Sequence, residues 1–233
     1  MRGHRVTLVT LAGDRSDAAR EAAHAGVHLL QFKLSMPRKL FFSWDMLRQL
    51  PPIVQEADIV HVHLNWTFPV WWGCHCARSA GIPLIFSPRG CLAPIRLQRS
   101  SVKKSLAGFF FDRRYLRAAA CIHVTCEAEQ QEVERYLQNK HPPIEVVSNG
   151  LNMEKWQGPC GREVIDRYWP VCREKRVVLF LGRINPIKGL ELLLEAWQLA
   201  MKNNPMWHLL ILGPDENNYS LQIQRYFTRL GLD

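Results

Sequence analysis

Short runs of valine, isoleucine and leucine recur along the chain, and segments with helical spacing lie between them. Continuous apolar runs of this kind are typical of parallel strands that helices cover on both faces. The pattern therefore predicts an α/β fold. Strands are expected at residues 6–10, 27–32, 59–63, 84–87, 121–125 and 145–147, and helices at 68–80, 101–117 and 127–138.

A second α/β unit is predicted after a segment with turn signals. Asn149-Gly150 marks a turn, and residues 151–175 have no clean period, so they are interpreted as an interdomain linker. Beyond it the sequence predicts a strand at 177–181, a helix at about 186–202, a strand at 208–212 and a helix at about 219–230. The expected domains are thus 1–150 and 176–233.

Composition excludes several classes of protein. Hydrophobic residues make up 47% of the chain, which is typical of a globular protein. No stretch approaches the roughly 18 apolar residues that would span a membrane, and no signal peptide is recognised. The seven cysteines are odd in number and form no Cys-x-x-Cys pair, so reduced thiols and a cytoplasmic location are expected.

The net charge of +9 is concentrated in residues 89–117 of the first domain, called the basic stretch below. The stretch contains a single acidic residue, Asp112, and eight cations: Arg89, Arg96, Arg99, Lys103, Lys104, Arg113, Arg114 and Arg117. Such a patch attracts polyanions or anionic lipid headgroups, and the apolar residues between the cations suit an interfacial amphipathic helix. A solvated basic face with no partner explains the same composition.

The strongest chemical signal is the segment Gly182 to Gly189, which follows a predicted strand. Ligands of open α/β sheets bind at the carboxyl ends of strands. Asn185 suits the N-cap of the next helix and Pro186 suits its first position, so Lys188 is expected in the first turn. A cation there opposes the helix dipole and costs roughly 0.3 to 1 kcal/mol.

Arg183 and Lys188 would therefore converge with free backbone N–H groups on one point. Two neighbouring cations at this point would destabilise the folded chain but would bind a diphosphate well, so an anion is the expected partner. Gly182 and Gly189 would permit close approach of the ligand. The alternative is that both cations simply lie on the surface.

These motifs resemble the family 4 glycosyltransferases of the GT-B fold. Besides the strand followed by Gly-Arg-x-x-Pro-x-Lys-Gly, further segments match in order, at residues 1–11, 57–63, 87–90, 120–127 and 147–152. The resemblance implies two Rossmann-like domains, with Arg183 and Lys188 on the diphosphate of a UDP- or GDP-sugar. It implies transfer of a hexose to a hydroxyl acceptor, with no cofactor other than the nucleotide-sugar substrate and no metal.

Parts of the family pattern are missing from the chain. The first strand with its Gly-rich loop is absent, although it is central in the strand order 3-2-1-4-5-6, and so is the late Glu-x7-Glu motif. The first domain is thus expected to lack its first strand and the second to be only partly present. A gap with two unpaired edges is predicted in the first sheet, and the chain alone is predicted to be inactive.

Two histidines share one face of a predicted strand. Period-two spacing aligns His61 with His63, and His63 at the carboxyl end would look into the cleft. In similar enzymes a histidine here orients substrate, so His63 is the candidate catalytic residue; a structural histidine is the alternative. These two histidines could also bind zinc together with Cys74, His75 and Cys76, but the spacing of the five residues matches no closed structural zinc pattern. The aromatic residues in 65–72 suit either a sugar contact or the core.

The acceptor is predicted from the basic stretch. Arg89, Lys103 and Lys104 are candidates for the acceptor or membrane side, and a lipid-linked acceptor in polysaccharide synthesis is expected at the inner face of the membrane, where the protein would be peripheral. Three alternatives remain: a catalytically inactive remnant, a partner subunit and a nucleic-acid-binding module. Nucleic acid is not the expected partner.

Overall fold

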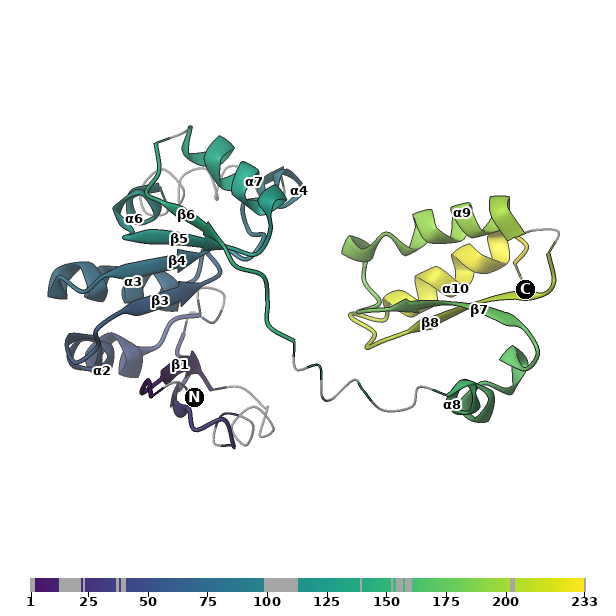
Figure 1. The fold of residues 1–233 in the computed structure, drawn as a ribbon, viewed down its shortest axis with the longest axis horizontal. Helices are drawn as coiled ribbons and strands as arrows, with labels where there is room; N and C mark the ends of the chain where they lie inside the picture. Colours follow the sequence, from purple (N-terminus) through teal and green to yellow (C-terminus); the bar gives the residue numbers. More distant parts are fainter. Residues whose placement is uncertain are drawn as a thin grey trace. The chain divides into compact units, whose positions relative to one another are not determined.

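The computed structural model describes residues 3–12, 22, 24–36, 38, 41–98, 113–138, 140–151, 153, 157, 161–201 and 204–232. The chain divides into two units, residues 1–151 and 152–233 (Figure 1). Each unit contains parallel strands and helices, so the predicted α/β class is confirmed.

Six parallel strands form two sheets in the first unit. β1 (Thr7–Leu11) pairs with β2 (His28–Phe32). The second sheet has the order β3 (Val60–His63), β4 (Leu84–Ser87), β5 (Cys121–Val124), β6 (Ile144–Val146). Each strand lies within one residue of its predicted position. No ladder joins β1 to β3 in the described residues, so the sheet is divided where the gap was expected.

The helices of the first unit were predicted in part. α3 (Phe68–Ala80) has its predicted bounds, and α7 (Glu127–Leu137) ends one residue early. α6 (Arg113–Ala118) contains the described end of the expected basic helix, whose residues 101–112 lie outside the described part of the chain. The short helix α4 (Pro94–Gln98) was not predicted.

The helix α2 (Trp44–Gln55) was also missed, although its signal is legible in the sequence. Buried Ser43 accepts from the Met46 amide at 3.2 Å, an N-cap, and the buried positions Met46, Leu50 and Val54 recur every four residues. Two consecutive prolines, Pro51 and Pro52, lie inside the helix and obscured this period. Burial of one apolar face offsets the hydrogen bonds that the prolines cannot donate.

One face of the β3–β6 sheet is covered by helices. On that face lie buried Val62, Phe86 and Ile122, and a Cβ added to Gly73 of α3 would lie 3.4 Å from Val62. The core also includes Leu137 of α7. Because side chains alternate along a strand, His61 and His63 point away from this core. These helices leave the opposite face of the sheet uncovered, and His61 and His63 lie on that face.

The second unit packs two helices on a pair of strands. β7 (Arg176–Leu181) and β8 (Trp207–Leu212) are parallel, and α9 (Leu190–Met201) and α10 (Tyr219–Arg229) lie on one face of them (Figure 1). Leu190, Leu194, Tyr219 and Ile223 form the core between them. The expected linker 151–175 is not structureless, since it contains α8 (Arg162–Tyr168) and the 3-10 helix η4 (Pro170–Cys172).

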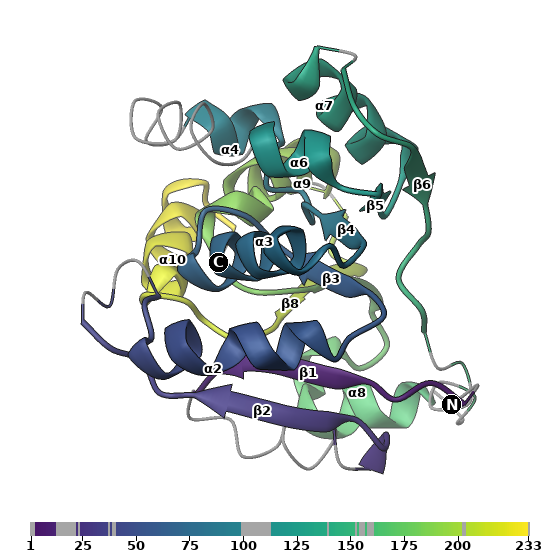
Figure 2. The same cartoon turned by 90° about the vertical axis from the view of Figure 1, so that its left-hand side faces the viewer.

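Two expectations about compartment can be compared with the structure. The six cysteines in the described residues, at positions 74, 76, 91, 121, 126 and 172, are free thiols, and Cys160 lies outside that part. None of the helices described is long and apolar enough to span a membrane. Within the first unit, α2 lies beside β1 and β2 (Figure 2).

Candidate functional site

The loop after β7 differs from the predicted helix start. Asn185 accepts from the Ile187 amide at 3.1 Å and so caps a 3-10 helix, η5 (Pro186–Lys188), rather than the α-helix. Gly189 then takes a left-handed φ of 66°, and α9 begins at Leu190. The prediction that Lys188 lies in the first turn of the α-helix was wrong, because the left-handed glycine interrupts the helical backbone.

Arg183 already has an anionic partner. Its Nη1 lies 2.6 Å from Oε1 of Glu216, and Nδ2 of Asn185 donates to the other oxygen of that carboxylate at 2.7 Å. The hydrogen bond from Asn185 and the Arg183 guanidinium hold the pKa of Glu216 below its usual range. Arg183 thus has an internal anionic partner that the sequence did not predict, and the predicted binding of a diphosphate stays a prediction. Lys188 is exposed and has no ion pair within the described residues.

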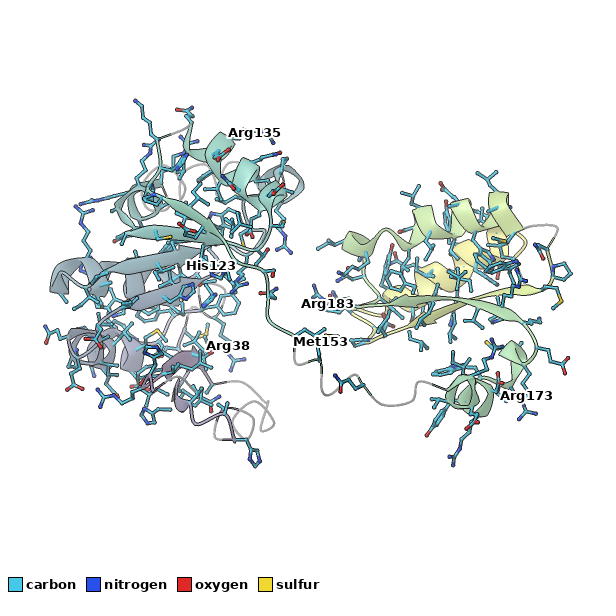
Figure 3. All side chains as sticks on the ribbon, viewed as in Figure 1. Arg38, His123, Arg135, Met153, Arg173 and Arg183 are labelled. Atoms are coloured by element: carbon cyan, nitrogen blue, oxygen red, sulfur yellow. The ribbon has the colours of Figure 1, made fainter. Side chains whose placement is uncertain are left out.

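Close backbone approach joins the two strand ends of the second unit. Gly213 follows β8, and a Cβ added to it would lie 1.8 Å from the carbonyl oxygen of Gly182. Only glycine therefore fits at position 213. The sequence had indicated close packing at Gly182 and Gly189, and Gly213 is the position where the structure requires it. The side chain of Arg183 extends from this end of the unit, and Arg173 lies at the opposite end (Figure 3).

A second group of polar residues lies at the carboxyl edge of the β3–β6 sheet. His63 ends β3, and Arg89 in the loop after β4 donates from Nε to His63 Nδ1 at 3.2 Å. Arg89 also donates from Nη1 to Oδ1 of Asn149 at 2.5 Å. The structure thus brings together two predicted site residues, His63 and Arg89, with Asn149 from the turn after β6.

A buried carboxylate supports the loop that contains Arg89. Glu129, in the first turn of α7, is 5% exposed. Its Oε1 accepts from the Gly90 amide at 2.6 Å, and its Oε2 accepts from the amide and hydroxyl of Thr125 at 2.7 and 2.8 Å. Burial acts to raise the pKa of Glu129, but these hydrogen bonds outweigh it and hold the pKa below the usual range. Glu129 is therefore ionised at neutral pH.

Three histidines share the uncovered face of the sheet. His123 Nε2 lies 2.9 Å from the carbonyl oxygen of Val147, so that nitrogen must be the donor. In the neutral ring, Nδ1 of His123 is then an acceptor, 3.4 Å from Nε2 of His61. Burial and the neighbouring His63 and His123 lower the pKa of His61 to about 4. Burial and Arg89 also lower the pKa of His63. His61 is thus neutral at physiological pH.

The structure separates the residues of the zinc alternative. Cys74 and Cys76 are buried in α3, whereas His61 and His63 lie on the uncovered face. Across the described residues, no three potential ligands are placed to hold a metal ion.

The aromatic residues in 65–72 contribute to the core of the first unit, since Trp66, Phe68 and Trp72 pack against it.

The basic stretch is described only in part. Lys103 and Lys104 lie outside the described residues. Of the cations in α6, Arg117 donates to the carbonyl oxygens of Leu137 and Lys140 at 3.2 and 3.3 Å, and the Arg113 guanidinium lies 5.0 Å from the Tyr136 ring centroid. These two arginines therefore bind α7 and the residues that follow it.

Sequence reasoning missed the carboxylates of both groups. Glu216 follows β8, and Arg183 follows the parallel neighbour β7. Strand pairing could therefore have predicted that the two residues lie at the same edge of the sheet. Glu129 lies four residues after Thr125, at the start of a predicted helix. This spacing is one residue longer than that of a capping box, and the N-cap is Cys126, so no capping motif marks Glu129 in the sequence.

Comparisons with known proteins cover nearly the whole chain. Residues 1–150 match the family model described as a glycosyl transferase 4-like domain, and residues 162–230 match that of glycosyl transferases group 1. A D-inositol 3-phosphate glycosyltransferase of Streptomyces scabiei is 24% identical over 151 residues, which are 64% of this chain and 33% of that protein. The match thus spans about a third of the length of this curated relative.

Solved structures have the same fold. The crystal structure of Anabaena HepE in complex with UDP-glucose superposes with a TM-score of 0.69 at 17% identity, covering 99% of this chain and 67% of that one. Sucrose-phosphate synthase of Thermosynechococcus elongatus gives a TM-score of 0.60 at 16% identity, covering 98% of this chain and 68% of that one. Both neighbours support the predicted GT-B type of fold.

Proposed function

Because this chain belongs to the family 4 glycosyltransferases, we propose that it contributes the donor diphosphate site and the acceptor-side histidine of a sugar transfer from a nucleotide sugar to a hydroxyl group. The loop that follows β7 carries this proposal. It contains Arg183 and, as the last residue of the 3-10 helix η5, Lys188, at the carboxyl end of a parallel strand.

The chemistry follows from the charges of this loop. In the transfer, the bond from the sugar carbon to the diphosphate oxygen breaks and a bond to the acceptor oxygen forms. Negative charge develops on the leaving diphosphate, and the proton of the acceptor hydroxyl passes to the departing phosphate oxygen. Arg183 and Lys188 would stabilise that charge electrostatically. The complex of the similar HepE with UDP-glucose supports a nucleotide sugar as the donor.

Calorimetric titration with UDP, GDP and UDP-glucose tests the donor site. Replacing Arg183 or Lys188 with alanine should raise the Kd roughly tenfold, because a charge-assisted hydrogen bond contributes about 1.5 kcal/mol or more. Arg173→Ala is the matched control, since Arg173 is an exposed cation at the other end of the same unit (Figure 3). Equal affinities in all four proteins would exclude this donor site.

The acceptor and location are finer proposals. We infer a lipid-linked acceptor in polysaccharide synthesis and a peripheral place at the inner membrane face, supported by the basic stretch between Arg89 and Arg117. Sedimentation with anionic and with neutral vesicles tests this. Binding to anionic vesicles that Lys103→Ala/Lys104→Ala weakens is expected, and equal sedimentation with both vesicle types would contradict it.

A further inference from the structure

The loop after β4 has an unusual backbone. Arg89 and Gly90 are consecutive residues with left-handed φ angles of 54° and 68°. This conformation costs a non-glycine residue roughly 1 kcal/mol or more, so surrounding contacts must hold Arg89 in it. Two backbone amides of this turn are bonded: Cys91 donates to the carbonyl oxygen of Pro88 at 3.2 Å, and Gly90 donates to Glu129 at 2.6 Å. Of the two, only the bond to Glu129 ties the turn to another element.

Glu129 is fixed on its other side. Its second oxygen accepts two hydrogen bonds from Thr125, which directly follows β5, so its position is set by the sheet. The carboxylate is nearly completely buried, so each of its hydrogen bonds is shielded from competing water. Glu129 thus connects the end of β5 with the loop after β4.

The Arg89 side chain determines which nitrogen of His63 is protonated. An arginine is always protonated, so its Nε donates and Nδ1 of His63 must be the acceptor. A neutral imidazole that accepts at Nδ1 has its proton on Nε2. The exposed His63 therefore offers an N–H donor to an acceptor or sugar oxygen and cannot accept a proton at Nε2.

We propose that Glu129 is a positioning residue of the transfer site, because its hold on Gly90 keeps Arg89 in the backbone conformation that bonds His63. This assignment rests on the proposed function, since it concerns the orientation of the acceptor-side histidine. Glu129 acts through Arg89 and does not itself touch substrate. It also affects the turn after β6 through the bond from Arg89 to Asn149.

Titration of His63 by nuclear magnetic resonance tests this proposal on the substrate-free chain. Spectra of ¹⁵N-histidine-labelled protein report both ring nitrogens from about pH 5 to pH 9, and His63→Gln identifies the signal. The groups that face His63 are Arg89, His61 and His123. Loss of the Arg89 contact removes a neighbouring cation, so the midpoint of His63 should rise toward about 6.5.

Two variants of Glu129 distinguish the effect of losing its hydrogen bonds from the effect of losing its negative charge. Glu129→Asp keeps the charge but is one methylene too short to reach both Gly90 and Thr125, and the midpoint should rise. Glu129→Gln also removes a negative charge, which by itself would lower the midpoint. An upward shift in both variants therefore reports the lost contact. Should the glutamine variant not fold, the aspartate variant decides alone.

The matched control is Glu127→Gln, an exposed carboxylate in the same first turn of α7. It should leave the midpoint of His63 unchanged. A midpoint in Glu129→Asp equal to that of the control, or lower, would overturn the proposal. The resonance titration of His63 contains no nucleotide, so its outcome does not depend on the calorimetric titration of the donor site. A failure to bind nucleotide would refute the proposed function, whereas an unchanged His63 midpoint would refute the positioning role of Glu129.

Discussion

The guanidinium of Arg183 lies 2.6 Å from the carboxylate of Glu216. Both side chains are partly exposed, and Glu216 comes from the loop after the neighbouring parallel strand. The cation that the sequence assigns to the donor diphosphate is thus held by an internal anion. A diphosphate that binds Arg183 has to compete with this carboxylate for the same donor groups.

Glu216→Gln should therefore tighten nucleotide binding. The change removes a negative charge from the site and weakens the competition for Arg183. An exposed ion pair is weak, so the Kd for UDP should fall by up to roughly fivefold. Calorimetry measures this, with Glu163→Gln in α8 as an exposed control. A rise in Kd would instead show that Glu216 preorganises Arg183 for the ligand.

Gly213→Ala should destabilise the second unit severely. The new Cβ would lie 1.8 Å from the Gly182 carbonyl oxygen, and φ of 151° already disfavours a side chain. Because the opposing atom is backbone, the strand ends must separate, at a cost of about 3 kcal/mol or more. Urea unfolding measures this loss.

Gly231→Ala is the control for that substitution. Gly231 also has a left-handed φ, 64°, but a Cβ there meets no atom within 4 Å. Backbone strain alone should cost about 1 to 2 kcal/mol at this position. Equal losses in the two variants would contradict the steric explanation for Gly213.

The sequence predicted elements that local patterns specify. Every strand in the described part of the chain was anticipated, because short apolar runs between turn signals mark strands. α3 was placed at its observed bounds, whereas α2 was missed because Pro51 and Pro52 interrupt its helical period. Local pattern thus identified most elements and failed where tertiary burial overrides propensity.

The candidate site was predicted less completely, for a physical reason. The motif around Arg183 is contiguous in sequence, but its partner Glu216 is 33 residues away. In the same way, Glu129 contacts Gly90 across 39 residues. Such contacts depend on which strands are neighbours and on the exact path of each loop. Residue types at fixed spacing identify a loop's chemistry, and the fold determines which of its groups are already paired.

The stability of the first unit should decrease as the pH falls through the range of His61. Its pKa is lowered to about 4 in the folded chain, from 6.5 as the ordinary value. Between these values the unfolded chain binds more protons, so the free energy of unfolding decreases as pH falls from about 6.5 to about 4. Urea unfolding at several pH values should show a smaller decrease for His61→Gln. Parallel curves would contradict this assignment.

Asn185 and Glu216 should behave as a coupled pair in the unfolding of the second unit. Asn185 is 4% exposed, accepts from the Ile187 amide and donates to Glu216 at 2.7 Å. Asn185→Asp keeps the acceptor that caps η5 but replaces the donor with a second carboxylate facing Glu216. The lost hydrogen bond and the repulsion should cost roughly 1 to 3 kcal/mol at neutral pH.

Adding Glu216→Gln to Asn185→Asp exchanges donor and acceptor across the same contact. The amide of the new glutamine can donate to the new aspartate, which still caps η5, so most of the lost stability should return. A double-mutant cycle from urea unfolding measures this coupling. If the two costs simply add, the contact does not stabilise the loop. Recovery of stability in the double variant would show that the loop containing Arg183 depends on a donor and an acceptor facing each other at positions 185 and 216. Titration of that variant with UDP would then show whether nucleotide affinity follows the geometry of the loop or its charge.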